Sequence, residues 1–372
     1  MSDHKSILVV TGDVGGARAM IPVLRELERR GAEFDLVDHG FIRDEASSSW
    51  RRVSLPPDGA GLVAKLKADY RGCVFGTSVS DTYPLGLARS ARAAGLPVMC
   101  VLDNWGNYRR RLEMDGQAAL VPECYAVMDK LAFEEALADG IPASCLRIVG
   151  HPGLASLPQE YGGYDVPAER QGLLQRAKWA GNDRKLIVFV SEPVANDQGV
   201  DGRSPQYRGY TEKVVLALLA RCLQPFAESI QIGLVAHPRE DAHALLAHWE
   251  TCRGSLVGGM LAAKSGREAV FVADGVCGMA SLLLYEAMLL AKPVLSLQPG
   301  MRLPQLAFLQ KKGIPFFTSD EAAAPEVIGE WMGKVLASSS VVDACELDPE
   351  ITIHHNAPAL LADLIVGLSP NE

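Results

Sequence analysis

The densest cluster of polar and aromatic residues, Asp103-Asn104-Trp105-Gly106-Asn107-Tyr108-Arg109-Arg110-Arg111, follows an apolar run at 97–102 that predicts a buried strand. A carboxylate at the carboxyl end of a strand can act as a general base, which makes Asp103 a candidate catalytic residue. Asn104, Trp105 and Tyr108 are candidates to contact a sugar or an acceptor, and the arginines can pair with phosphate. The alternative is a solvated arginine face with the tryptophan anchored in the core.

A second group of candidates lies in the turn after the first apolar run, residues 6–12. Asp13 precedes Gly15 and Gly16, and a glycine pair between a strand and a helix lets another molecule approach the backbone. Asp13 is therefore a second candidate base, although it can equally cap the helix that follows. The spacing is not G-x-G-x-x-G, so dinucleotide binding has little support. His151, after the strand expected at 146–150, is either structural or part of the same site.

Residues 269–300 organise the second half of the chain. The run 269–273 predicts a strand, Asp274, Gly275 and Gly278 a turn, 281–290 a helix and 294–297 another strand. Free amide groups at the start of such a helix, from Gly278, Met279, Ala280 and Ser281, suit a diphosphate. Glu286, the only charged residue between Asp274 and Lys292, can accept hydrogen bonds from ribose hydroxyls. The alternative is a generic strand–helix–strand unit with Glu286 at its rim.

Three more groups of polar residues follow apolar runs of the second half. They are Ser191 and Glu192 after 185–190, His237 and Arg239 after 231–236, and Gln298, Arg302 and Gln305 after 294–297. Pro238 at the first position of a helix explains the H-P-R-E sequence without any ligand. The long polar stretch 194–210 predicts either a binding flap or an insertion.

The elements that must position these residues alternate between strands and helices, which predicts parallel sheets covered on both faces. A chain of 372 residues is too long for one core. We expect an α/β protein with two Rossmann-like, doubly wound domains, residues 1–160 with the C-terminal helix 356–372, and residues 176–355. The Gly-, Pro- and Tyr-rich segment 158–167 is the expected linker.

Composition excludes several classes of function. The net charge of −9, from 36 Lys and Arg against 45 Asp and Glu, argues against general nucleic-acid binding. The eight cysteines are scattered without a C-x-x-C pair, and we expect neither a metal site nor a cofactor. No apolar run approaches the length of a membrane span, so we expect a cytoplasmic protein. Arg109 to Arg111 with Trp105 and Leu112 leave peripheral contact with anionic lipid open, as a homodimer also remains open.

The string D-G-x-x-G-x-x-S-L-L-L-Y-E-A-M-L-L-A-K-P-V-L, which begins at Asp274, resembles the nucleotide-sugar signature of GT-B-fold enzymes. The order of elements over about residues 6–370 is similar to UDP-N-acetylglucosamine 2-epimerases, lipid A disaccharide synthase and capsule or teichoic-acid polymer transferases. The stretch after Asp103 also resembles a D-H-W-x-N-Y-R sequence of transferase-like proteins, with Asn104 in place of the histidine. That replacement removes a possible acid/base group.

The resemblance implies a fold and a set of roles. Two Rossmann-like domains would face a cleft, and the C-terminal helix would cross back to the first. Ser191, Glu192, His237 and Arg239 would lie near the donor diphosphate. The sugar or acceptor would face the residues Gly15, Gly16, His151, Gln298, Arg302 and Gln305.

The function that we expect first is metal-independent transfer of a sugar from a nucleotide-activated donor, most simply a UDP-sugar. The acceptor would be a hydroxyl of a glycan, a lipid-linked molecule or a small molecule, in polysaccharide or glycoconjugate biosynthesis. The alternatives are a UDP-sugar 2-epimerase or hydrolase, a CDP-polyol phosphotransferase, and a non-catalytic nucleotide-sugar-binding partner.

Overall fold

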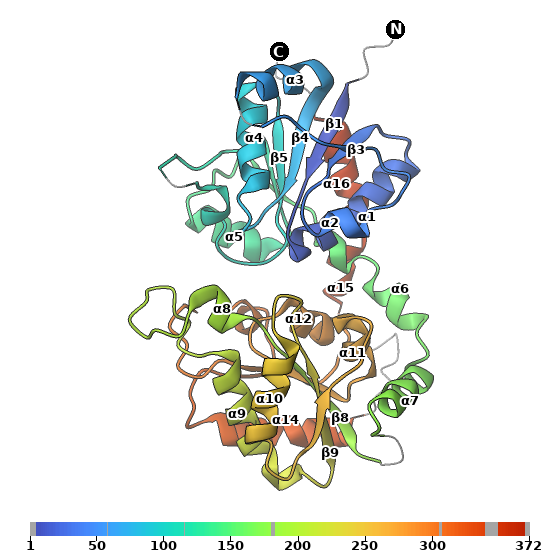
Figure 1. The fold of residues 1–372 in the computed structure, drawn as a ribbon, viewed down its shortest axis with the longest axis vertical. Helices are drawn as coiled ribbons and strands as arrows, with labels where there is room; N and C mark the ends of the chain where they lie inside the picture. The colour runs from blue at the N-terminus through green and yellow to red at the C-terminus, as the bar shows by residue number, and fades with distance from the viewer. Residues whose placement is uncertain are drawn as a thin grey trace. The chain divides into compact units, whose positions relative to one another are not determined.

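The chain folds into two compact units, Met1–Leu157 with Glu350–Glu372, and Pro158–Pro349. The computed structural model describes residues 5–57, 59–114, 116–179, 183–304, 307–338 and 349–368. Each unit contains a parallel sheet with helices on its faces (Figure 1). This confirms the predicted α/β class with two doubly wound, Rossmann-like units.

The first sheet has seven strands in the order β3-β2-β1-β4-β5-β6-β7, with parallel pairing throughout. The strands are β1 (Ser6–Val10), β2 (Phe34–Val37), β3 (Arg52–Val53), β4 (Tyr70–Gly76), β5 (Val98–Val101), β6 (Cys124–Val127) and β7 (Leu146–Ile148). The order reverses at β1, which pairs with β2 on one side and β4 on the other. Ligands of open α/β sheets bind at the carboxyl ends of the strands beside such a switch point.

The helices of the first unit cover this sheet. They are α1 (Val14–Arg29), α2 (Ile42–Glu45), α3 (Ala60–Asp69), α4 (Tyr83–Ala93), α5 (Lys130–Ala138), α15 (Ile351–His355) and α16 (Ala357–Val366), with short 3₁₀ turns η1 (Arg110–Leu112) and η2 (Pro152–Leu154). Figure 1 shows α16 beside α1, and its Leu361 and Ile365 join the core of this unit. The C-terminal helix therefore returns to the first unit, as the family resemblance implied.

The second sheet has six parallel strands in the order β10-β9-β8-β11-β12-β13. The strands are β8 (Lys185–Val190), β9 (Ile230–Val235), β10 (Val257–Met260), β11 (Gly275–Gly278), β12 (Val294–Leu297) and β13 (Phe316–Thr318). Here the order reverses at β8, between β9 and β11, which gives the second unit its own switch point.

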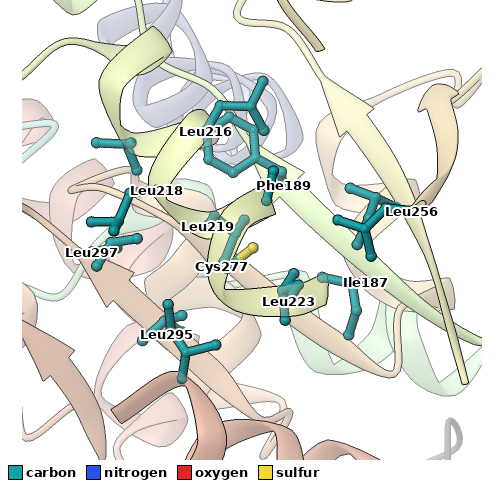
Figure 2. Packing of buried hydrophobic residues seen from close by; sticks show 14 of the residues in the cluster. Ile187, Phe189, Leu216, Leu218, Leu219, Leu223, Leu256, Cys277, Leu295 and Leu297 are labelled. Atoms are coloured by element: carbon teal, nitrogen blue, oxygen red, sulfur yellow. The ribbon is translucent and has the colours of Figure 1, made fainter. Parts of the chain in front are cut away.

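One helix face accounts for much of the second core. Leu216, Leu219 and Leu223 of α9 pack over apolar side chains of β8, β11 and β12 (Figure 2). The helices of this unit are α7 (Val166–Arg176), α8 (Val194–Gln198), α9 (Glu212–Leu223), α10 (Ala242–Cys252), α11 (Gly266–Val272), α12 (Leu282–Leu289), α13 (Phe308–Lys311) and α14 (Ala324–Ala337), with η3 (Gln224–Phe226); α6 (Leu157–Gly162) begins at the boundary.

The expected strand at 269–273 is wrong, because these residues lie in and directly after helix α11, whose N-terminus Ser265 caps. The next strand, β11, occupies the expected glycine turn. Position 275 of this strand requires glycine because α14 packs closely on it. A Cβ atom there would approach Val335 Cγ2 of α14 to 2.7 Å. The glycine thus indicates close packing and not a turn.

Two segments that we expected to be irregular contain helices. Much of 158–167 lies in α6 and the start of α7, and 194–198 forms α8. Among the described residues, no helix is long and apolar enough to cross a membrane.

Candidate active site

The turn between β1 and α1 lies at the switch point of the first sheet. Asp13 is the N-cap of α1, and its Oδ1 accepts a hydrogen bond from the Gly16 amide at 2.9 Å. The geometry therefore contains the capping interaction that the sequence offered as an alternative to catalysis. A proton-transfer role for Asp13 stays a prediction. Gly15 and Gly16 are crowded positions, since a Cβ atom on Gly16 would lie 2.4 Å from Thr11 Oγ1.

Asp103 follows β5 and forms a buried ion pair with Arg111. Asp103 Oδ1 lies 2.7 Å from Arg111 Nη1, and the two side chains are 9 % and 8 % exposed. Gly106 and Asn107 adopt positive φ angles of 90° and 58°, which turn the chain so that Arg111 comes back beneath Asp103. Arg111 also donates to Gly106 O at 3.1 Å and to Thr77 Oγ1 at 3.3 Å.

The second oxygen of Asp103 faces the glycine turn. A Cβ atom on Gly15 would lie only 2.2 Å from Asp103 Oδ2, so glycine permits this approach. Burial raises the pKa of Asp103 to about 6; Arg111 opposes the rise and Asp13 adds to it. A carboxyl group with this pKa can exchange a proton near neutral pH.

The other residues of this loop have partners within the protein. Trp105 is buried and donates from Nε1 to Asp129 at 3.0 Å, and the buried Tyr108 donates its hydroxyl to Glu135 at 2.6 Å. Asn104 Oδ1 accepts from the Trp105 amide at 2.9 Å. These contacts favour the anchoring role that competed with sugar stacking. Trp105, Arg111 and Leu112 are buried, so they do not present the lipid-facing surface considered above.

His151 also lies inside the first unit. Its Nδ1 accepts from the Gly153 amide at 3.1 Å, which leaves Nε2 to donate to Asp103 O at 2.9 Å. The His151 amide in turn donates to His354 Nδ1, 3.0 Å away on α15. His151 thus joins the end of β5, through its ring, to the C-terminal segment, through its main-chain amide, which favours the structural one of the two alternatives offered by the sequence.

Sequence reasoning missed a polar pair at this switch point. His39 Nε2 and Asp81 Oδ2, after β2 and β4, lie 2.8 Å apart and are 29 % and 23 % exposed. The His39 ring packs on Tyr83 with centroids 4.3 Å apart, and a Cβ atom on Gly12 would collide with both members of the pair. The position of each residue shortly after a strand was the available signal.

At the switch point of the second sheet, Glu192 holds the turn after β11. Glu192 Oε1 accepts from the Ala280 amide at 2.6 Å, and Oε2 lies 3.2 Å from Arg208 Nη1. Sequence analysis placed Glu192 and Ala280 in the site but did not single out Arg208. Ser281 caps α12 through its hydroxyl, which accepts from the Leu283 amide at 3.3 Å. Gly278, the last residue of β11, and Met279 after it are both buried.

The H-P-R-E segment and Ser191 share one carboxylate. Glu240 accepts from Ser191 Oγ and from the His237 amide, both at 2.7 Å. Burial raises the pKa of Glu240, and nearby Glu212 and Glu192 add to the rise. Arg239 is exposed and forms a two-pronged ion pair with Asp197 at 2.6 and 2.8 Å. The predicted diphosphate contacts of these residues are not tested by this arrangement.

Glu286, the predicted ribose ligand, has a protein partner that the sequence did not indicate. Arg267 of α11 donates from Nε and Nη2 to the two oxygens of Glu286, each at 2.9 Å. The same guanidinium reaches Glu160 at 2.8 Å. A bidentate pair of this kind satisfies the buried carboxylate, so Glu286 does not need a ligand to explain its burial. Its contact with ribose remains a proposal.

Gln298 and Arg302 belong to the loop after β12. Gln298 is buried, accepts from the Tyr210 hydroxyl at 3.1 Å and donates to Met279 O at 3.2 Å. Arg302 is exposed, bonds to Gly202 O and lies over the Tyr207 ring at 5.5 Å. Gln305 lies outside the described residues.

Within the part of the chain that the structure describes, His, Cys, Asp and Glu side chains form no group of three suited to a metal ion.

Comparison with known proteins adds the fold family. No protein-family model and no curated protein sequence matches this chain. Among solved structures, it is similar to UDP-GlcNAc 2-epimerase from Neisseria meningitidis bound to UDP-GlcNAc, with 11% identity, a TM-score of 0.64, and 97% of this chain and 99% of that chain covered.

Two further structures agree with this likeness. The epimerase from Methanocaldococcus jannaschii has 12% identity, a TM-score of 0.63, and 97% and 100% coverage. HepE from Anabaena in complex with UDP-glucose has 15% identity, a TM-score of 0.60, and 97% and 100% coverage. The fold is therefore of the GT-B type, as the family resemblance implied.

Proposed function

We propose that this protein is an enzyme that acts on a nucleotide sugar, with a UDP-sugar as its substrate. The observation that carries the proposal is the likeness over 97% of the chain to structures solved with UDP-GlcNAc or UDP-glucose. The second unit supports it locally, since Arg208 and the Ala280 amide already hold a carboxylate at the switch point. Hydrogen-bond donors that hold a carboxylate at the start of a helix are also suited to hold a phosphate.

Of the reactions considered, we favour 2-epimerisation or hydrolysis of the UDP-sugar over transfer to an acceptor. The full-length likeness to 2-epimerases supports this choice, because those chains are covered almost from end to end. Both reactions need one nucleotide sugar and no second sugar-accepting molecule. Sugar transfer remains the competing outcome of the experiment below.

Asp103 is the residue that we propose to exchange a proton with the substrate. Its pKa of about 6 lets it accept a proton near neutral pH, and the Arg111 charge keeps it partly ionised despite burial. Gly15 gives access to Asp103 Oδ2, since any side chain at that position would cover the oxygen. Asp13 is the second candidate base and also caps α1.

A two-stage experiment tests the function. The first stage compares the thermal stabilisation of the protein by UDP, GDP, CDP and dTDP, because a ligand that binds the native state raises its apparent stability. The second incubates the protein with UDP-GlcNAc alone and follows products by NMR. We expect stabilisation by UDP and formation of either the 2-epimer or UDP and free sugar.

The other results separate the alternatives. Stabilisation by no nucleotide would overturn the proposal. UDP binding with turnover only after an acceptor is added would assign the protein as a transferase. UDP binding without turnover in either condition would leave a nucleotide-sugar-binding protein.

A further inference from the structure

A carboxylate of the protein itself occupies the switch point of the second sheet. Glu192, two residues after β8, accepts one hydrogen bond from the Ala280 amide at 2.6 Å and pairs with Arg208 at 3.2 Å. Ala280 lies between β11 and the N-cap of α12, an eight-residue helix. A guanidinium and a main-chain amide converging on one carboxylate form the same donor pattern that binds a phosphate at a helix N-terminus.

Arg208 is fixed in place but is not saturated with acceptors. Its carbonyl oxygen accepts from the Arg302 amide at 2.8 Å, and a Cβ atom on the next residue, Gly209, would lie 1.9 Å from Gly300 O. The side chain is only 14 % exposed. Among the described residues, its buried Nε has no hydrogen-bond partner. A phosphate offers more acceptor oxygens than a carboxylate and can therefore accept from more than one nitrogen of a guanidinium.

The surroundings of Glu192 favour its release. Burial raises the pKa of Glu240, and the nearby charges of Glu212 and Glu192 add to the rise. Glu212 is itself buried and accepts from the Ala195 amide at 2.9 Å. Glu240 therefore repels the charge of Glu192, which Arg208 and the Ala280 amide offset. A phosphate and Glu192 cannot both take those two donors.

We propose that Glu192 is the resident anion of the phosphate site and that the phosphate of a nucleoside diphosphate displaces it. Arg208 and the Ala280 amide then bind the phosphate, and the Glu192 carboxylate turns away from them. The inference rests on the proposed function but reverses the role that the sequence suggested for Glu192. As a ligand of the nucleotide, Glu192 would strengthen binding; as the resident anion, it competes with the nucleotide.

The test is calorimetric titration of UDP, and separately of inorganic pyrophosphate, into the full-length protein and three kinds of variant. Glu192→Gln and Glu192→Ala remove the competing charge, and having both keeps the test open if one fails to fold. Arg208→Met removes the proposed phosphate partner. Glu212→Gln is the matched control, because it removes a nearby buried charge and leaves the Glu192 contacts in place.

We expect the Glu192 variants to bind UDP roughly tenfold more tightly than the wild type, the scale of one charge-assisted hydrogen bond. The gain with Glu212→Gln should be several-fold smaller, and Arg208→Met combined with Glu192→Gln should abolish it. Equal or weaker UDP binding by folded Glu192 variants, with the wild type binding UDP, would overturn this inference and leave the proposed function standing. Failure of UDP to bind to the wild type and to every folded Glu192 variant would overturn both.

Discussion

Asp103 Oδ1 and Arg111 Nη1 lie 2.7 Å apart in an ion pair that is almost completely removed from solvent. The guanidinium is also bonded to Gly106 O and Thr77 Oγ1, so the pair ties the loop after β5 to the end of β4. Breaking such a pair on one side leaves an uncompensated buried charge, which costs more than removing both partners. This asymmetry makes the pair suitable for a double-mutant cycle.

The first prediction concerns the stability of this pair. Asp103→Asn should lower the free energy of unfolding by ~3–5 kcal/mol, because Arg111 stays charged and buried. Combining Asp103→Leu with Arg111→Met should cost clearly less than the sum of those two single changes. Urea denaturation of the four proteins in the cycle measures the coupling. Strictly additive costs would show that the two charges do not stabilise one another.

The second prediction concerns the pH dependence of turnover. If Asp103 is the base, it must be ionised, so kcat/KM should fall as the pH drops through about 6, the raised pKa of this carboxyl. The rate constant falls at low pH because protonation of Asp103 removes the carboxylate oxygen that accepts the proton of the substrate. Rates on UDP-GlcNAc between pH 5 and pH 8 measure it. A wild-type profile that is flat across this range would remove Asp103 from the proton-transfer step.

Two substitutions of Asp13 distinguish its role as a helix cap from a role as the catalytic base. Asn caps a helix about as well as Asp, so Asp13→Asn should change the unfolding free energy by only a few tenths of a kcal/mol, whereas Asp13→Ala should cost ~1 kcal/mol. Thermal melting gives both values. If Asp13 is the base, the Asn variant keeps its stability and UDP affinity and loses turnover. Turnover at the wild-type rate would confine Asp13 to its cap.

Glu286 has two candidate partners, Arg267 in the protein and ribose in a nucleotide. Glu286→Ala should weaken UDP binding by ~1–3 kcal/mol if the carboxylate bonds to ribose, and Glu286→Gln should lose less because the amide oxygen still accepts. Arg267→Met is the matched control, since it breaks the ion pair and keeps the carboxylate. Calorimetry on folded variants decides the assignment. Equal losses for Arg267→Met and Glu286→Ala would assign Glu286 to fold maintenance alone.

The burial of Lys292 predicts that the stability of the protein depends on pH. Its amine is buried and donates to Phe271 O at 2.8 Å and Ala273 O at 3.0 Å. Burial lowers its pKa from 10.5 to about 7, with Asp274 opposing the shift. The unfolded chain therefore binds more protons between these values, so stability gains from rising pH in this window.

Lys292→Met supplies the reference for that measurement, because methionine does not titrate and all other groups are shared. The unfolding free energy of the wild type minus that of the variant should rise by roughly 1–3 kcal/mol from about pH 7 to about pH 10. Denaturant titrations at several pH values give the difference. A difference that stays constant or falls with pH would contradict the lowered pKa.

The sequence by itself determined the elements whose signals are local. Strands at 185–190 and 294–297 agree residue for residue with β8 and β12, because a short apolar run between polar turns has few other stable arrangements. The Asp13 cap could also be predicted from the sequence, since its partner, the Gly16 amide, is only three residues away. Alternation of strands and helices was enough to give two parallel sheets and to place most candidate residues at strand ends.

Only the tertiary structure decided which strand ends lie side by side and which polar groups neutralise one another. Glu192 meets Ala280 because β8 pairs with β11, and His39 meets Asp81 because β2 and β4 flank β1. Arg267 reaches Glu286 because 266–272 is helical, a segment whose apolar residues suit a strand or a buried helix equally well. The need for glycine at position 275 arises only from the close packing of α14 on β11. These contacts join residues far apart in the chain, and a single sequence has no local signal for the sheet order that brings them together.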